Sequence, residues 1–304
     1  MKKIVSLLLC VILTSSAVCL SGCIRLLSLD EYSVYPALYI IEDKEGHRCY
    51  LFGTESTGKD DGIFPLPDII EDAYSYCSAV AAEYDITKDN KTEPVKYTDG
   101  TTIKDHLSER VYNAAVSKIT AAEGEYKQEY EKYHIAEWYS MIERYAAKSY
   151  GYSTEFGTDR YILNKAETDG KTVYELESAE SQTELLLSIS DKVYEQFIIS
   201  ILNSRGSTSY DYYYQLYTTG DTDSLARMIN SSKSAVYNDA ELQTAMDNYY
   251  GLMFTQRNKA TAEKIMGFLS DGERVFVAVS CTNIVGTDGI AAVLLSNGYR
   301  VIRK

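Results

Sequence analysis

The chain has 304 residues, and its 44 acidic and 30 basic side chains give a formal net charge of −14. With 45% hydrophobic residues, it is long and apolar enough for one large domain or two small ones with a buried core. So acidic a composition excludes nucleic acid and anionic lipid surfaces as expected partners.

The first 23 residues, MKKIVSLLLCVILTSSAVCLSGC, predict a lipoprotein signal peptide. A basic start at Lys2 and Lys3 precedes a short uncharged apolar run, and small residues lead to Cys23. The apolar run is too short to span a bilayer comfortably. We therefore expect residues 1–22 to be removed and the thiol of Cys23 to be lipidated. Its acyl chains would anchor the protein on the extracytoplasmic face of a bacterial membrane, in the cell envelope. The alternatives are a transmembrane anchor and an ordinary signal peptide that ends in cysteine.

The exported part is expected to be a lipidated tether, residues 23–35, and one folded domain, residues 36–304. No low-complexity linker divides the domain. Besides Cys23 it contains Cys49, Cys77 and Cys281, an odd number that allows at most one disulfide. Cys49 and Cys77 could pair across neighbouring elements or remain separate core thiols.

The start of the domain predicts a ββαβ unit. Residues 37–42 and 48–52 have the composition of two hairpin strands around a turn at 43–46. Pro67 is placed at the first turn of a helix with apolar residues at helical spacing, and 79–84 predict a third strand.

The remainder of the domain predicts a helical middle and a return to strands. The first part is expected to have helices within 102–150, a helix at 159–168, a turn at 169–170, a strand at 172–176 and then another helix. Helices continue over 190–270, with breaks near 205–209 and 231–235. A strand at 275–279, a polar turn at 280–283, a helix at 286–297 and a strand at 299–302 follow. The expected fold class is α/β, with a central mixed sheet built from strands at both chain ends and a large helical insertion.

Several segments resemble the TraB/GumN family, which includes the Tiki metalloproteases. They are YLFGTEST, AVAAEYD, GTDRYILNKAETDGKTVYELESAESQ, YTTGDTDSL, QRN and VAVSCTNIVGTDGIAAVLLSNGYRV, and they cover nearly all of the exported chain. The long middle segment is the most specific. The resemblance implies an erythromycin-esterase-like α/β fold. In active members it implies two Gly-x-x-His motifs, whose histidines act with acidic residues in hydrolysis or hold a divalent metal.

Both histidine positions differ in this chain. The first motif is Gly53-Thr54-Glu55-Ser56, with Ser56 in place of histidine. In the second, Ser280-Cys281-Thr282-Asn283, serine replaces the glycine and Asn283 replaces the histidine. The glycine-rich continuation 286–289 is retained. The sequence therefore indicates the position of an active site without its expected imidazoles.

Two carboxylates match acidic positions of the family and are the candidate catalytic residues: Glu83 and Glu177. With Glu55 and Asp85, which lie close in sequence to the same loops, they could hold a hard cation such as calcium or manganese through oxygen ligands. The alternative is that Glu83 and Glu177 cap helices or pair with the cations Arg257 and Lys171.

The candidate binding residues are the first motif, Gly53, Thr54, Glu55 and Ser56, together with Asp159, Arg257 and Asn283. Arg257 and Asn258 match an Arg-Asn pair that the resemblance implies orients the cleft, and a surface salt bridge is the alternative. The histidines are expected to be surface or packing side chains outside the cleft: His47, His106 and His134. Without a histidine to act as base, neither Ser56 nor Cys281 is expected to be a nucleophile.

Two functions follow from these patterns. One is a lipoprotein that retains the cleft of a degenerate hydrolase as a binding or scaffold module for a protein or peptide ligand. The other is a divergent metal-dependent peptidase or esterase with carboxylate ligands, for which a divalent metal is the implied cofactor. Loss of both histidines favours the first.

Overall fold

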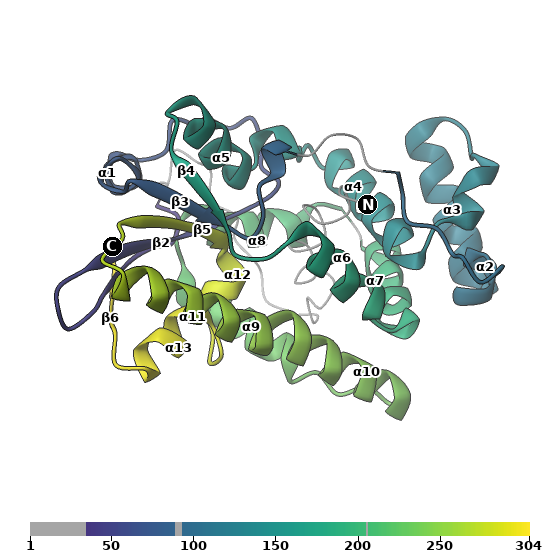
Figure 1. The fold of residues 1–304 in the computed structure, drawn as a ribbon. Helices are drawn as coiled ribbons and strands as arrows, with labels where there is room; N and C mark the ends of the chain where they lie inside the picture. The colour runs from purple at the N-terminus through teal and green to yellow at the C-terminus, as the bar shows by residue number, and fades with distance from the viewer. Residues whose placement is uncertain (1–34, 89–92, 205) are drawn as a thin grey trace.

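A computed structural model describes residues 35–88, 93–204 and 206–304. The predicted signal peptide and Cys23 lie outside these ranges. One six-stranded sheet, in the order β4-β3-β5-β2-β1-β6, forms the centre of the protein (Figure 1). Its strands are β1 Leu38–Glu42, β2 Arg48–Thr54, β3 Ala79–Ala82, β4 Thr172–Glu175, β5 Val275–Ser280 and β6 Arg300–Arg303.

The sheet is mixed, as the sequence predicts. β4, β3, β5 and β2 run parallel to their neighbours, whereas β1 pairs antiparallel with both β2 and β6. β5, from the end of the chain, lies between β3 and β2 from its start, β6 adds the other C-terminal strand beside β1, and β4 comes from the middle. The carboxyl ends of the four parallel strands meet at one edge, where ligands bind in open α/β sheets.

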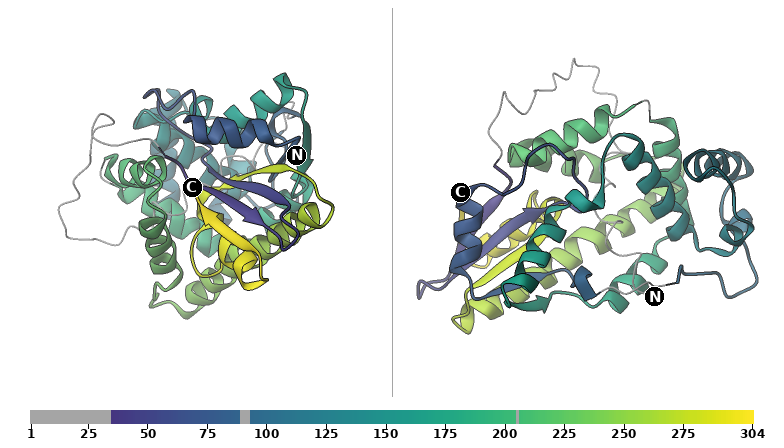
Figure 2. Two further views of the ribbon diagram at one scale, coloured as in Figure 1. Left: turned by 90° about the vertical axis from the view of Figure 1, so that its left-hand side faces the viewer. Right: turned by 90° about the horizontal axis from the view of Figure 1, so that it is seen from above.

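Helices cover the sheet and extend beyond that edge. They are α1 Asp68–Tyr76, α2 Ile103–His106, α3 Glu109–Glu123, α4 Ile135–Ser149, α5 Thr158–Thr168, α6 Ala179–Ser188, α7 Asp191–Asn203, α8 Thr208–Thr218, α9 Thr222–Lys233, α10 Ala240–Tyr250, α11 Arg257–Ser270, α12 Cys281–Ile284 and α13 Ile290–Ser296. A π-helical turn, η5 Gly251–Gln256, joins α10 to α11. α1 and α5 lie on one face of the sheet and α11 and α13 on the other, while α2, α3, α4 and α7 pack together away from it (Figures 1 and 2).

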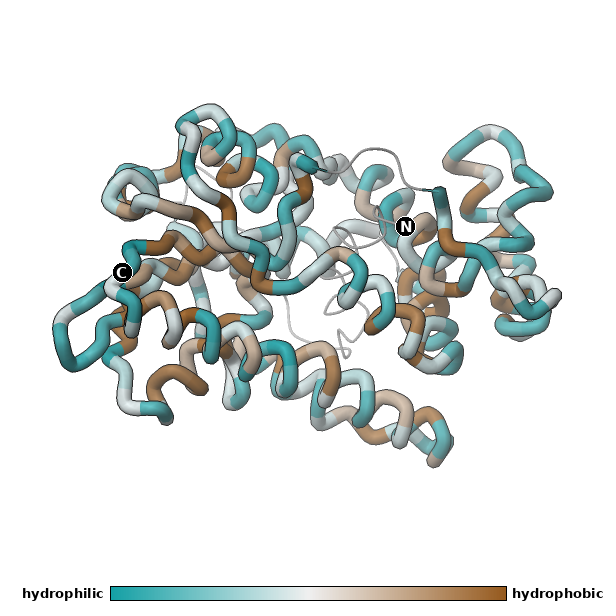
Figure 3. The backbone as a smooth tube through the Cα atoms, in the orientation of Figure 1, coloured by the Kyte–Doolittle hydropathy of each residue, from teal (hydrophilic) through white to brown (hydrophobic). Residues whose placement is uncertain are grey.

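The core follows from this layering. β1, β3 and β5 are buried along their whole length, because each has a strand on either side and helices pack on the faces of the sheet. Their apolar runs are visible in Figure 3 as the hydrophobic centre of the sheet. The edge strands β4 and β6 are partly exposed.

The segment after β5 differs from the predicted polar turn and long helix. Residues 281–284 already form α12, and the next helix begins at Ile290 rather than at Gly286. Gly286 has a φ of 93°, which a right-handed helix does not allow. A Cβ on Gly289 would lie 2.4 Å from two backbone carbonyl oxygens, so the chain passes too tightly here to be helical.

The cysteines of the described chain, Cys49, Cys77 and Cys281, are buried free thiols, which agrees with separate core thiols. Burial raises the pKa of Cys49 to about 11 and that of Cys77 to about 12. Over the described ranges, no helix has both the length and the apolar composition needed to cross a bilayer.

Candidate functional site

The ends of β3 and β4 bring Glu83 and Glu177 side by side. Each glutamate follows its strand closely, and the two strands are parallel neighbours. The backbone pairing continues past the strands, where Glu177 N donates to Glu83 O at 2.8 Å. The two candidate catalytic carboxylates therefore start from adjacent points of the same sheet edge.

Arg257 lies between these carboxylates. Its Nε donates to Glu177 Oε1 at 2.7 Å and its Nη2 to Glu177 Oε2 at 3.0 Å, a bidentate ion pair. The same Nη2 is 3.6 Å from Glu83 Oε2. The Arg257 side chain is only 8% exposed. Burial opposes its charge, but the charges of Glu83 and Glu177 raise the pKa of Arg257 on balance. The predicted pairing with Arg257 is confirmed.

The predicted pairing with Lys171 is wrong. Its Nζ donates to the carbonyl oxygens of Tyr74 at 2.6 Å and Cys77 at 2.5 Å, at the end of α1. Lys171 lies before β4, at the amino end of that strand, whereas the glutamates lie at the carboxyl end. Sequence spacing alone did not distinguish the two ends.

The other oxygen of Glu83 is held from the end of β5. The backbone N–H of Ser280 and the side-chain amide of Asn283 both donate to Glu83 Oε1 at 3.3 Å. Asn283 is the residue at which the family resemblance implies the second histidine. Burial, followed by the charge of Glu177, raises the pKa of Glu83, and Arg257 opposes this rise. Glu83 is thus engaged by a cation and two neutral donors.

The loop after β2 packs against both α12 and the start of α5. A Cβ on Gly53 would lie 2.9 Å from Cys281 Cβ, so only glycine allows this approach of β2 to α12. Glu55 N donates to Thr158 Oγ1 at 2.9 Å, and Thr158 N donates to Glu55 O at 2.8 Å. The predicted binding residues Thr54 and Ser56 of this loop are buried.

Glu55 and Asp85 do not join Glu83 and Glu177, which corrects the expectation of four carboxylates in one cation site. Glu55 Oε1 accepts hydrogen bonds from Tyr213 Oη on α8 and from Cys281 Sγ, the latter at 3.1 Å. Asp85 accepts from the backbone and hydroxyl of Thr87 and pairs with Lys88 at 3.1 Å. Both carboxylates are therefore turned toward other partners.

The residues present do not fit a divalent metal. Among the described residues, no group of three or more His, Cys, Asp or Glu side chains is arranged to hold an ion. Arg257 supplies the positive charge between Glu83 and Glu177, in the place where a cation bridging them would bind. Because the guanidinium satisfies these carboxylates, a metal would have to displace a buried ion pair.

The histidines lie elsewhere, as predicted. His47 Nδ1 is 2.8 Å from Asp43 Oδ2 at the β1–β2 turn. His106 Nδ1 is 2.7 Å from Asp191 Oδ2. His134 is the N-cap of α4.

Asp159, at the start of α5, is the remaining acid close to the cluster. Its Oδ1 accepts from Arg160 N at 2.6 Å. Burial, together with the nearby charge of Glu83, raises the pKa of Asp159 to about 7. Near neutral pH this carboxyl is therefore shared between its protonated and ionised forms.

Three buried polar atoms of the cluster have no hydrogen-bond partner within the described chain: Arg257 Nη1, Asn258 Oδ1 and Asn283 Oδ1. Asn258 is oriented by its own amide, which donates to Asp288 O at 3.0 Å. Buried polar groups in folded proteins are nearly always satisfied. One donor and two acceptors are therefore left for a polar ligand.

Sequence reasoning did not include Tyr213, Thr158 and Ser280 N–H among the site contacts. Tyr213 lies in a tyrosine-rich helix whose pattern indicates packing, and Thr158 is a first-turn residue of α5. No spacing signal links either to Glu55. A backbone donor such as Ser280 N–H carries no side-chain signature at all.

The fold and site define an α/β protein with an arginine-bridged carboxylate cluster at the carboxyl ends of parallel strands. The profile of the TraB/PrgY/gumN family matches residues 37–303, nearly the whole chain. The chain belongs to the TraB/PrgY/gumN family. No curated protein matches the chain, and neither does any solved structure.

Proposed function

We propose that this family member is a binding or scaffold module for a peptide or protein ligand and that it has lost the hydrolytic chemistry of its cleft. The observation that carries the proposal is the engagement of Glu83 by Arg257, Ser280 N–H and the Asn283 amide. A carboxylate held in this way contributes to a fixed, polar surface rather than to a metal site.

The unpartnered atoms support binding. Arg257 Nη1 offers a charged donor, while Asn258 Oδ1 and Asn283 Oδ1 offer acceptors. A peptide group has both a carbonyl oxygen and an N–H, and it complements such a mixed set. Burial of these atoms strengthens each hydrogen bond that a ligand would make.

Calorimetric titration of the full chain in detergent with manganese, cobalt, zinc and calcium tests the proposal. We expect no saturable binding, and no turnover in peptidase and esterase screens. One-to-one metal binding that Glu83→Gln removes, together with turnover that the same variant loses, would contradict it and establish the metal-dependent hydrolase.

One observation favours a second candidate, a hydrolase without metal. Asp159, whose pKa is about 7, lies near Glu83, whose pKa is also raised. Two carboxyls of this kind can divide the roles of general acid and general base. Turnover without added metal, lost in both Asp159→Asn and Glu83→Gln, would support this candidate.

We also propose that the protein is exported and lipid-anchored through Cys23. The basic start, short apolar run and small residues before Cys23 support this. Growth with a radiolabelled fatty acid should label the wild-type chain and leave Cys23→Ser unlabelled. Label on Cys23→Ser, or a wild-type chain that keeps residues 1–22, would contradict the proposal.

A further inference from the structure

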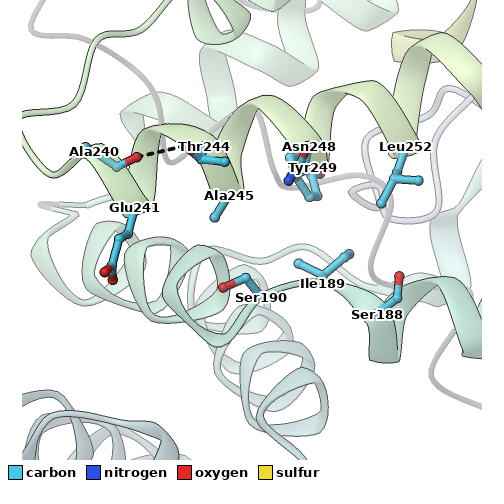
Figure 4. A pocket seen from close by; sticks show the side chains of 10 residues that line it. All are labelled: Ser188, Ile189, Ser190, Ala240, Glu241, Thr244, Ala245, Asn248, Tyr249 and Leu252. Atoms are coloured by element: carbon cyan, nitrogen blue, oxygen red, sulfur yellow. Dashed lines mark hydrogen bonds between the residues drawn. The ribbon is translucent and has the colours of Figure 1, made fainter.

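A groove separate from the carboxylate cluster lies between α10 and the junction of α6 with α7. Its volume is about 540 Å³. Along one wall, Ala240, Thr244, Asn248 and Leu252 recur once per helical turn, and Ile189 with its neighbouring serines forms the other wall (Figure 4). At a rise of about 1.5 Å per residue this wall is roughly 18 Å long. An extended chain of about five residues has that length.

The walls combine apolar and hydrogen-bonding surface. Ile189, Ala245 and Leu252 lie along the groove, and Thr244 and Asn248 are exposed on its α10 side (Figure 4). The Thr244 hydroxyl donates to Ala240 O at 2.9 Å, which leaves its oxygen able to accept. The small side chains at 240 and 245 keep the groove open. Such a surface suits a backbone with alternating donors and acceptors and small side chains.

A charge cluster lies at the end of the groove that Glu241 lines. Lys192 Nζ on α7 is 3.0 Å from Asp239 Oδ2 and 2.8 Å from Glu241 Oε2 across the groove mouth. Two carboxylates against one ammonium leave an excess negative charge at this end. A cationic group of the ligand would complement that charge.

The other end leads toward the carboxylate cluster. Leu252 belongs to the π-helical turn η5, which ends directly before Arg257. Tyr249, which also lines the groove, is close enough to Arg257 for their charges to interact. π-Helical turns occur frequently at functional sites. The groove and the cluster are thus joined by one continuous stretch of chain.

We propose that this groove binds a linear peptide of about five residues, with a basic residue at the Glu241 end and small uncharged side chains over Ile189, Ala245 and Leu252. This inference rests on the proposed binding function and names its ligand class and position.

Selection from a displayed library of random heptapeptides on the full chain tests the inference. We expect enrichment of sequences with one basic residue followed by small apolar ones. A selected peptide should bind at least about tenfold more weakly to Ala245→Trp, because the indole fills the groove. It should lose a similar factor with Glu241→Lys, because this substitution reverses the charge at residue 241. Glu263→Lys makes the same charge change at an exposed position of α11 and should leave the affinity unchanged. Thermal unfolding followed by circular dichroism checks that each variant is folded, and exposed Thr244→Trp replaces Ala245→Trp if that variant unfolds.

The outcomes separate this inference from the proposed function. No enriched peptide, or peptides indifferent to groove filling and to Glu241→Lys, would overturn the groove assignment. If Asn283→Ala weakens the affinity of the selected peptides and the groove variants do not, the binding function stands and the groove assignment is rejected. If the groove variants weaken the affinity of the peptides while Asn283→Ala and Arg257→Lys do not, the groove assignment stands and binding by the cluster is rejected.

Discussion

Arg257 and Glu177 are joined by two parallel hydrogen bonds of 2.7 and 3.0 Å, although they lie 80 residues apart in the chain. The pair connects the start of α11 to the end of β4. Glu83 Oε2 lies 3.6 Å from the same guanidinium. The Arg257 side chain therefore links the start of α11 to the ends of both β3 and β4.

Replacing Arg257 by methionine should therefore destabilise the protein strongly. Removing one partner of a buried ion pair costs about 3–5 kcal/mol, because the remaining charges stay buried without compensation. Urea unfolding followed by circular dichroism measures this loss. Lys259→Met, at an exposed position of the same helix, is the control and should change stability by less than about 0.5 kcal/mol. Equal effects of the two substitutions would show that the ion pair contributes nothing.

Stability should fall as pH rises from about 4.5 to about 8, because of Glu143. This residue on α4 is 1% exposed, and its two carboxylate oxygens have no hydrogen-bond partner in the described chain. Burial, with a smaller contribution from Glu55, raises the pKa of Glu143 from 4.5 to about 8. The folded state thus binds this proton more tightly than the unfolded state. The resulting stability is fully present below about pH 4.5 and is lost as pH rises through about 8, by at most roughly 5 kcal/mol.

Glu143→Gln tests this pH dependence, since glutamine stays neutral. We expect the variant to be more stable than the wild type at pH 9 and similar to it at pH 5, measured by urea unfolding. Asp247→Asn, an exposed acid on α10, should keep the wild-type profile. A wild-type profile retained in Glu143→Gln would assign the pH dependence to other groups.

Gly53→Ala should destabilise the protein by about 1–3 kcal/mol through overpacking. The new Cβ would lie 2.9 Å from Cys281 Cβ and 3.1 Å from its Cα, and α12 has no flexible side chain there to yield. Gly267→Ala in α11 is the matched control, because no atom beyond its chain neighbours and the backbone of its own helix lies within 4 Å of its Cβ position. It should stabilise by about 0.5–1 kcal/mol, since alanine is the better helix former. Chemical denaturation of both variants measures the difference, and a neutral Gly53→Ala would contradict the close approach.

Histidines at both positions where the family resemblance implies them should create metal affinity. Asn283→His would place an imidazole beside Glu83, which Asn283 already contacts at 3.3 Å, and Ser56→His would add the imidazole of the first motif. Nitrogen and carboxylate ligands together favour zinc or manganese. Calorimetry should show one-to-one binding in the double variant and none in Ser56→Gln with Asn283→Gln. Absence of binding in the histidine variant would show that Arg257 excludes cations even when imidazoles are present.

Local patterns in the sequence determined the elements and the position of the site. The hairpin, β3, β5 and the helical middle follow from apolar periodicity, turn residues and helix-start signals such as Pro67, which directly precedes α1. Glu83 and Glu177 each follow an expected strand, and both were candidates before any contact was known. These signals are readable because each depends on residues that are close in the chain.

The partners of the charged groups were decided only by the tertiary structure. Arg257 and Lys171 were equivalent cations in the sequence, but packing places one between the glutamates and the other at the end of α1. Glu55 turns toward Tyr213, 158 residues away, instead of joining Glu83. The groove along α10 likewise exists only because α6, α7 and α10 pack at their particular spacing. Contacts of this kind depend on how distant elements come together, which local residue patterns do not specify.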